Sequence, residues 1–226
     1  MHDYRLFWRA FRSSFRTTGA ILPSGRRLSR ALARFVAESS NRPRRILEVG
    51  PGTGPATREI AAVLGPEDRL DLVEVNEEFV RRLRERLQTD PPMAAVAERV
   101  RVLQGRVEDL PRDDGYDVIV SGLPLNNFSV AEVDTILRGF NELARPGAML
   151  SFFEYIGLRR LKASVVGRAE RERLRGIGRL FESLLSGREV RREAVWLNVP
   201  PAWVHHVKLE AAGRPPARQG TVRGVK

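Results

Sequence analysis

The sequence contains no cysteine and only three histidines, His2, His205 and His206. Without thiols the chain has neither a disulfide framework nor a thiolate metal site, and the histidine spacing matches no zinc motif. No apolar run reaches the roughly 18 to 20 residues that span a bilayer. The N-terminus also lacks the continuous apolar core of a secretory signal. These absences predict a metal-free cytoplasmic protein that does not cross a membrane.

The 226 residues are 42% hydrophobic and 30% charged, enough for one sizeable α/β domain with additions. The net charge of +11 is unevenly distributed. Residues 1–45 carry 11 arginines against 2 acids, residues 46–157 carry 12 against 20, residues 158–192 carry 11 basic residues against 4 acids, and residues 193–226 carry 5 against 2. An acidic middle between basic segments suggests a catalytic core that its flanks present to a polyanion, either nucleic acid or an anionic membrane.

Residues 4–16, YRLFWRAFRSSFR, place aromatic side chains at helical spacing. On a helix the aromatic residues fall within an arc of roughly 100°, and four arginines fall within roughly 60° beside it. Such a helix either caps the core of the domain or lies in a bilayer interface, with its rings in the acyl boundary and its guanidinium groups at lipid phosphates. For the second alternative we expect membrane contacts from Phe7, Trp8, Arg9, Phe11, Arg12 and Phe15.

The rest of the chain alternates strand and helix patterns. A helical pattern with Leu28, Leu32 and Val36 on one side completes an N-terminal extension over residues 1–45. Strands are predicted at residues 46–49, 69–75, 99–105, 116–122 and 148–155, with helices ending near 64 and spanning about 77–87 and 130–143. Asn76 and the pair Ser129 and Glu132 are predicted helix N-caps.

This alternation predicts an α/β fold with a Rossmann-like, mainly parallel sheet and helices on both faces, over residues 46–210. A basic helix is expected at about 161–185, and residues 195–210 are expected to form two strands around a Pro-Pro turn. The polar segment 211–226 is expected to be disordered. Ligands of such sheets bind at the carboxyl ends of the strands.

The turn after the first strand reads EVGPGTG, residues 48–54. It lacks the Lys-Ser/Thr ending of a P-loop, and its third glycine comes one residue early for a dinucleotide-binding turn. Glycines let the backbone pass close to a ligand where a Cβ would clash. Glu74 closes the second strand among apolar neighbours, and its two oxygens suit the two hydroxyls of a ribose.

This turn resembles motif I of class I S-adenosylmethionine-dependent methyltransferases. The resemblance implies S-adenosyl-L-methionine as the cofactor, with Glu48 facing its amino acid end, directly or through water, and the backbone of Val107 near its adenine. The family usually has an acid after the third strand where this chain has Arg106, which leaves Glu108 or Asp109 as the substitute. The cofactor-binding residues that follow are Glu48, Gly50, Gly52, Gly54, Glu74, Val75, Val107, Glu108, Ser121 and Gly122.

The loop after the fourth strand, SGLPLNNF at residues 121–128, has Gly122 and Leu125 where enzymes that methylate base amines have Asn and an aromatic residue. Both base-reading side chains are missing, which disfavours a nucleic-acid substrate. The loop is similar instead to that of bacterial soluble phospholipid N-methyltransferases. TGAILPSGRRL at 18–28, with Gly25 in place of a serine, and NVPPAWV at 198–204 resemble two further segments of those enzymes.

The resemblance covers most of residues 1–210 and implies N-methylation of phosphatidylethanolamine towards phosphatidylcholine by an enzyme bound peripherally to the inner face of an anionic membrane. It places Thr18, Ser24 and Arg26 at the lipid phosphate, with a solvated position at a helix start as the alternative for Arg26. Tyr155, after the fifth strand, either touches the amine or packs on a helix. Asn198 either orients the head group or braces the Pro-Pro turn.

Two rival functions stay open. The positive charge and the Leu-Pro loop favour an RNA adenine N-methyltransferase. Arg106 at the adenine loop favours a non-catalytic lipid-binding or nucleic-acid-binding protein on the same fold.

Overall fold

A computed structural model describes residues 25–38, 40–113, 115–156 and 167–210 of the chain. The predicted amphipathic helix over residues 4–16, with its expected membrane contacts, lies outside these ranges, as do Thr18 and Ser24. Within them, no helix is long and apolar enough to cross a bilayer.

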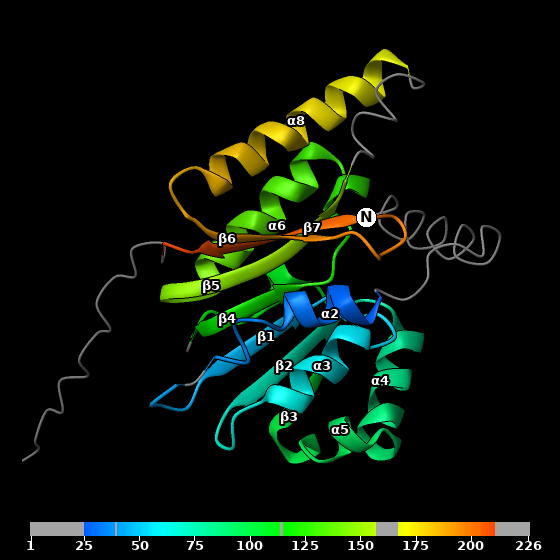
Figure 1. Cartoon of the computed structure of the whole chain (residues 1–226), viewed down its shortest axis with the longest axis vertical. Coiled ribbons are helices and arrows are strands. Elements are labelled where there is room, and N and C mark those ends of the chain that lie inside the picture. Colours follow the sequence, from blue (N-terminus) through cyan, green and yellow to red (C-terminus); the bar gives the residue numbers. More distant parts are fainter. Residues whose placement is uncertain (1–24, 39, 114, 157–166, 211–226) are drawn as a thin grey trace, which may run out of the picture.

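A seven-stranded sheet forms the centre of the molecule, in the order β3-β2-β1-β4-β5-β7-β6 (Figure 1). Neighbouring strands from β3 to β5 are parallel, whereas β7 is antiparallel to both β5 and β6. This arrangement confirms the predicted Rossmann-like fold. The strands are β1 (Arg45–Val49), β2 (Arg69–Glu74), β3 (Val100–Gln104), β4 (Tyr116–Ser121), β5 (Ala144–Tyr155), β6 (Glu189–Val195) and β7 (Ala202–Lys208).

Helices cover both faces of the sheet, each above its own apolar cluster (Figure 1). One cluster joins Leu32 and Ile60 to the sheet, and the other joins Phe140 and Phe181 to it. Burial of these side chains is the main force that holds each helix on the sheet. The first face carries α2 (Arg26–Leu32), α3 (Pro55–Val63), α4 (Glu77–Thr89) and α5 (Pro91–Ala94), and the second carries α6 (Val130–Leu143) and α8 (Arg168–Leu185).

Helix starts follow the predicted caps. The Asn76 side chain accepts hydrogen bonds from the backbone N–H groups of Glu78 and Phe79 at the start of α4. Ser129 and Glu132 form a reciprocal capping box at the start of α6. Both interactions satisfy backbone donors that the first helical turn leaves free. The sequence signals for these two helix starts are therefore confirmed.

The segment around the Pro-Pro turn differs from the prediction. We expected both strands within residues 195–210, but the first strand, β6, lies upstream and ends at Val195. β6 is an edge strand, and its mostly exposed charged side chains hide the apolar alternation that marks a half-buried strand. The short helix α5 was also not predicted.

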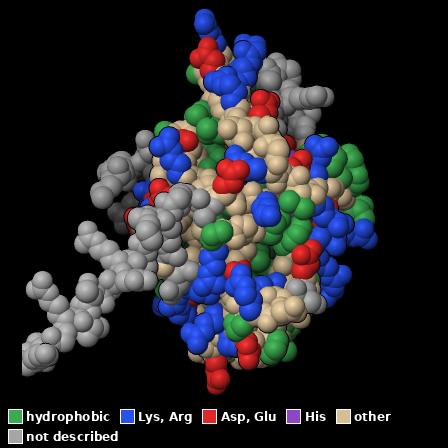
Figure 2. Space-filling view, turned by 90° about the vertical axis from the view of Figure 1, so that its left-hand side faces the viewer, with side chains coloured by type: hydrophobic (Ala, Val, Ile, Leu, Met, Phe, Trp, Pro, Cys, Tyr) green, Lys and Arg blue, Asp and Glu red, His purple; other side chains and the backbone are tan. Residues whose placement is uncertain are grey.

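Ion pairs tie together the strand starts at the amino edge of the sheet. Asp71 accepts hydrogen bonds from the guanidinium groups of Arg45 and Arg101, and Asp117 pairs with Arg145 at 2.7 Å. On this face Lys and Arg side chains stand among Asp and Glu rather than in one patch of positive charge (Figure 2). The opposite, carboxyl edge remains for ligand binding.

Candidate functional site

The Gly-rich turn after β1 opens the carboxyl edge of the sheet. Gly50, Gly52 and Gly54 have φ angles of +69°, +57° and +83°, which lie in the left-handed region that favours glycine. A Cβ on Gly50 would overlap the Leu123 side chain, whereas a Cβ on Gly52 would meet nothing within 4 Å. Gly52 therefore faces open space, and its backbone is accessible to a ligand.

Glu74, the last residue of β2, holds this turn from the inside. It is 1% exposed, and its two carboxylate oxygens accept the Gly52 N–H at 3.0 Å and the Asn76 N–H at 2.9 Å. Burial raises the pKa of Glu74, and the backbone N–H groups of Asn76, Gly52 and Val75 partly offset the rise. Each oxygen keeps a lone pair for a further donor, so the carboxylate is fixed in place for a ligand hydroxyl.

Glu48 is a second buried acid close to Glu74. Its exposed fraction is 0%, and within the described residues neither of its carboxylate oxygens has a hydrogen-bond partner. Burial raises the pKa of Glu48 to about 8, Thr57 opposes that rise, and the Glu74 carboxylate adds to it. Buried polar atoms are almost always paired in native proteins. The bare carboxyl group therefore fits a ligand donor, and a cationic ammonium would satisfy it most strongly.

The loop after β4 crosses close to the Gly-rich turn. Gly122 donates its N–H to the Val49 carbonyl at 2.8 Å, and a Cβ on Gly122 would lie 2.5 Å from the Gly50 carbonyl oxygen. Only glycine allows this approach. Gly122 therefore stands, for reasons of backbone packing, at the position where enzymes that methylate base amines have an asparagine. Ser121 before it is fully buried.

In the loop after β3, Arg106 occupies the position where the resembled family usually has an acid. Arg106 pairs with Glu108 at 2.8 Å between Nη2 and Oε1. The acid two positions later therefore neutralises the cation beside the expected adenine site. Val107 is 3% exposed, and a Cβ on Gly105 would meet nothing within 4 Å. The loop backbone at Gly105 is open at this end, as it is at Gly52.

Comparison with known proteins agrees with this geometry. A family model described as a methyltransferase domain matches residues 46–147. The ubiquinone/menaquinone biosynthesis C-methyltransferase of Ectopseudomonas mendocina is 32% identical over 131 residues, which are 57% of this chain and 49% of that protein. The ornithine lipid N-methyltransferase of Singulisphaera acidiphila is 32% identical over 134 residues, 57% of this chain and 65% of that protein.

Residues 46–147 form an S-adenosylmethionine-dependent methyltransferase domain. Its fold also matches an O-methyltransferase from Bacillus cereus in complex with SAH, with a TM-score of 0.56 and 18% identity over 90% of this chain and 89% of that one. The chain spans about half the length of the C-methyltransferase relative and 65% of the lipid N-methyltransferase.

S-adenosylmethionine is the cofactor of this methyltransferase domain, and the residues at the carboxyl edge fit it. The unpartnered Glu48 suits the cofactor's ammonium group, Glu74 suits the ribose hydroxyls, and the open backbone at Gly52 suits close approach. Arg86 was not identified from the sequence. It donates to the Thr53 carbonyl at 2.5 Å. Its charge also opposes, as a minor cause, the rise that burial produces in the pKa of Glu48. It lies in the Arg-rich and Glu-rich pattern of α4, where nothing distinguishes it from surface arginines.

Tyr155 and Asn198 both lie at the carboxyl edge of the sheet, at the end of β5 and in the turn before β7. Tyr155 ends β5, is half-buried, and pairs in register with Ala202 at the start of β7. Asn198 is 5% exposed, accepts the Gly25 N–H at 2.9 Å, and donates to the Pro200 carbonyl at 2.7 Å. Of its two predicted roles, the structure shows the bracing one.

A depression of about 400 Å³ adjoins the Gly-rich turn. The predicted phosphate ligand Arg26 lines it, 3.3 Å from Glu59 and with 69% of its side chain exposed. The depression has a positive balance of charge, as an anionic group requires. Its lining is Arg26, Ser29, Thr53, Pro55, Arg58, Glu59, Arg82 and Arg86.

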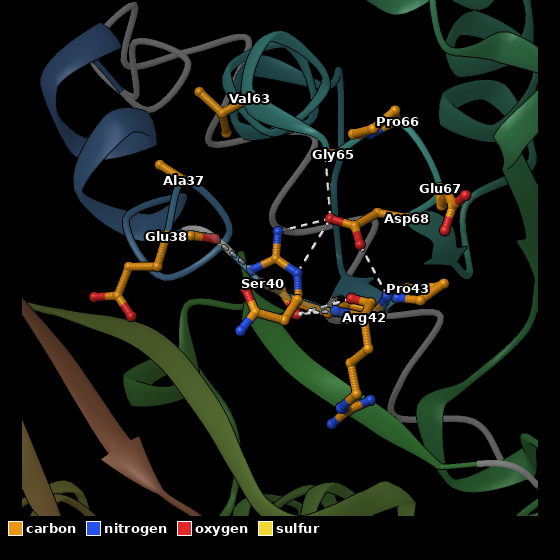
Figure 3. Close-up of a pocket in the computed structure, with 12 residues that line it drawn as sticks. Ala37, Glu38, Ser40, Arg42, Pro43, Val63, Gly65, Pro66, Glu67 and Asp68 are labelled. Carbon is orange, nitrogen blue, oxygen red and sulfur yellow. Dashed lines mark hydrogen bonds and ion pairs between the residues drawn. The ribbon is translucent and has the colours of Figure 1, made fainter.

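A second depression, of about 430 Å³, lies at the amino edge and is structural (Figure 3). Arg44 pairs with Asp68 at 2.6 Å and donates to the carbonyls of Val36 and Glu38. Burial alone would raise the pKa of Asp68, but Arg44 holds it below its usual value. The main charged pair of this depression is thus satisfied within the protein, far from the Gly-rich turn.

The two histidines of β7, His205 and His206, lie on opposite faces of the strand. The His206 ring packs at a tilt against Phe35, 4.9 Å between ring centroids, and His205 stacks against Phe152 at 5.1 Å. Burial lowers the pKa of His206 to about 4, although Glu193 opposes this. Both side chains are at most 3% exposed, so neither is placed to act as a base on a substrate.

Proposed function

We propose that the protein uses S-adenosylmethionine to methylate the head-group amine of a membrane phospholipid, phosphatidylethanolamine and its partly methylated products. The observation that carries the proposal is the hydrogen bond between Gly25 and Asn198, which are 173 residues apart in the sequence. It joins segment 18–28 to segment 198–204, the two flanking segments that resemble phospholipid N-methyltransferases. Their contact at the carboxyl edge, where β5 ends in Tyr155, supports a shared substrate-binding role.

The ornithine lipid N-methyltransferase gives independent support, because its name describes methylation of an amine on a membrane lipid. The cationic depression around Arg26 provides a suitable place for the phosphate of such a lipid. The arginines there can pair with the phosphate of a zwitterionic head group and leave its amine directed away from them.

The loop after β4 argues against an RNA base as the substrate. Leu125 is 1% exposed and Phe128 is 2% exposed, and both pack in the apolar cluster beneath α6. Neither side chain is available to stack on an unpaired base, which base-methylating and base-deaminating enzymes require. The loop instead closes the core.

The acceptor must reach the site as a neutral amine, because an ammonium group has no free electron pair. A primary ammonium has a pKa of about 10.4, and desolvation lowers it. When bound, the cofactor supplies a methyl group activated by a positively charged sulfur. Burial raises the pKa of Tyr155, so its hydroxyl stays protonated at pH 7 and serves as a hydrogen-bond partner of the amine rather than as a phenolate base. Positioning of the amine then provides up to roughly 7–11 kcal/mol.

Transfer of label from methyl-labelled cofactor tests the proposal. The full chain is offered phosphatidylethanolamine vesicles, RNA and a quinone in separate reactions, with Glu74→Ala as the inactive control. We expect label in the lipid, with mono-, di- and trimethylated products resolved by mass spectrometry. Label confined to RNA or to the quinone would refute the proposed substrate.

A further inference from the structure

The turn between β6 and β7 carries a concentration of exposed apolar side chains. Trp196, Leu197 and Val199 are 64%, 71% and 61% exposed. We call residues 196–200 the hairpin tip. It lies at the carboxyl edge, because Tyr155 at the end of β5 pairs with Ala202 at the start of β7. The tip thus stands at the end of the sheet that holds the cofactor site, on the same side as the start of α2 (Figure 1).

The hairpin tip carries no charge and few polar side-chain groups. Residues 194–204 contain no charged side chain, and their one amide side chain, Asn198, is buried with both ends of its amide bonded. Pro200 and Pro201 have no N–H, and their carbonyls accept hydrogen bonds from Asn198 Nδ2 and from the Ile156 N–H at 2.7 Å. The absence of charge and the bonds at Asn198 and the two prolines lower the cost of moving this turn out of water, although the remaining backbone groups of the tip need partners at the head-group level.

Aromatic and cationic groups stand just behind the tip. Trp196 packs edge-on against Trp203 at 6.1 Å between centroids, and the Arg192 guanidinium lies 5.0 Å above the Trp203 ring. Tryptophan favours the boundary between lipid tails and head groups, and arginine extends its charge to lipid phosphates while its stem covers apolar surface. The order of groups, apolar at the tip and cationic behind it, matches the layers of an anionic leaflet.

We propose that the hairpin tip inserts into the head-group region of an anionic phospholipid bilayer and anchors the carboxyl edge of the domain to it. The inference rests on the proposed lipid substrate. A head group that stays in the leaflet can enter the cofactor site only if the carboxyl edge of the domain is held against the membrane. It adds a second membrane contact, at residues 196–200, to the one expected from residues 4–16. A tip without charged side chains suits a fluid apolar layer better than a charge-matched protein partner.

Sedimentation with vesicles of phosphatidylethanolamine and phosphatidylglycerol tests the tip. The test variant is the full chain with Trp196→Ser, Leu197→Ser and Val199→Ser together. All three positions are exposed, so the fold should tolerate the changes. The matched control is Val190→Ser, which removes an apolar side chain of 57% exposure from the other end of β6. We expect the triple variant to bind roughly tenfold or more weakly and the control within about twofold of the parent. Equal binding by all three proteins would overturn the proposal.

Fluorescence provides a second readout. With Trp8→Phe and Trp203→Phe, Trp196 is the only tryptophan left. Its emission should be quenched by acrylamide in the free protein, and by brominated lipid once vesicles are added. Protection from acrylamide before vesicles are added would mean that protein covers the tip, either residues 1–24 or a second copy of the chain, and the proposal would be wrong. Binding to vesicles without quenching by brominated lipid would also contradict it.

These measurements need no turnover, so the two proposals fail in different ways. If the tip inserts but no lipid is methylated, the proposed substrate is wrong and the tip remains a membrane anchor. If the triple variant binds and methylates lipid as the parent does, the substrate stands and the anchoring role of the tip is refuted.

Discussion

Glu48 carries a fully buried carboxyl group for which the described part of the chain supplies no well-formed hydrogen bond, although Thr57 lies near enough to oppose the rise of its pKa. Its ordinary pKa of 4.5 applies to the unfolded chain, whereas burial raises its folded pKa to about 8. Between these values the folded protein binds the extra proton. The stability contributed by this group is therefore fully present below pH 4.5 and is lost as the pH rises to about 8.

Glu48→Gln should accordingly change how stability depends on pH. Near pH 5 the neutral amide and the protonated acid are similar, so we expect nearly equal melting temperatures. At pH 9 the variant avoids a buried charge and should be more stable, by on the order of 1–4 kcal/mol. Thermal unfolding of cofactor-free protein at pH 5, 7 and 9 measures this. Parallel curves for the two proteins would show that the carboxyl group is not buried as described.

Glu74 should control cofactor affinity, because it both holds the Gly52 N–H and offers the ribose acceptor. Hydrogen bonds to charged groups contribute about 1.5–3 kcal/mol each. We therefore expect Glu74→Ala to raise the dissociation constant of S-adenosylhomocysteine by roughly a hundredfold or more in titration calorimetry. Glu77→Ala, at an exposed position in the first turn of α4, is the matched control and should bind normally. A wild-type isotherm for Glu74→Ala would remove the ribose assignment.

Single residues were predictable from the sequence where one local pattern determines them. Glu74 is placed by its strand and Gly52 by its turn, so their positions at the carboxyl edge could be predicted, and their contacts with the cofactor stay predictions. The Arg106 and Glu108 ion pair needed the structure, because the sequence does not show which of two adjacent acids turns back toward the arginine. Arg86 needed it as well, because its contact with the Gly-rich turn depends on how α4 packs.

The elements were predicted best where their signals are local and apolar. The helix expected at 130–143 has these bounds in the structure, because a capping box marks its start and apolar periodicity its length. β6 was misplaced because an edge strand pairs on one side only, so exposed charges replace the alternation on which strand prediction depends. The antiparallel pairing of β7 with β5 is a long-range choice that no local pattern encodes.

The β6–β7 hairpin yields a prediction about stability. Asn198→Ala would leave the Gly25 N–H and the Pro200 carbonyl without their partners in a largely buried place. Each unsatisfied group costs about 1–3 kcal/mol, and a protein of this size loses roughly 2–4 °C in melting temperature per kcal/mol. We expect a drop of roughly 4 °C or more by calorimetry, against little change for the exposed Asn127→Ala. Equal melting temperatures would mean that Asn198 does not brace the hairpin.

For the whole molecule, the order β3-β2-β1-β4 places four predicted cofactor loops along one edge of the sheet. The alternating pattern predicted that edge, but not the two depressions or the exposed hairpin tip, which arise from packing between distant segments. Net charge alone left nucleic acid and membrane equally open. The contact between Gly25 and Asn198, together with the uncharged tip, favours the membrane.

A ligand that binds all four loops should stabilise the whole fold, because it binds the folded chain and not the unfolded one. At a concentration of 100 times its dissociation constant, S-adenosylhomocysteine should contribute about 2.7 kcal/mol. That corresponds to a rise of roughly 5–10 °C in melting temperature. Scanning fluorimetry measures it, with ATP and NAD at equal concentration as controls. The Gly-rich turn lacks the P-loop lysine and the dinucleotide spacing, so both nucleotides should leave the melting temperature unchanged. An equal shift with either nucleotide, or none with S-adenosylhomocysteine, would contradict the assignment of this edge to a sulfonium cofactor.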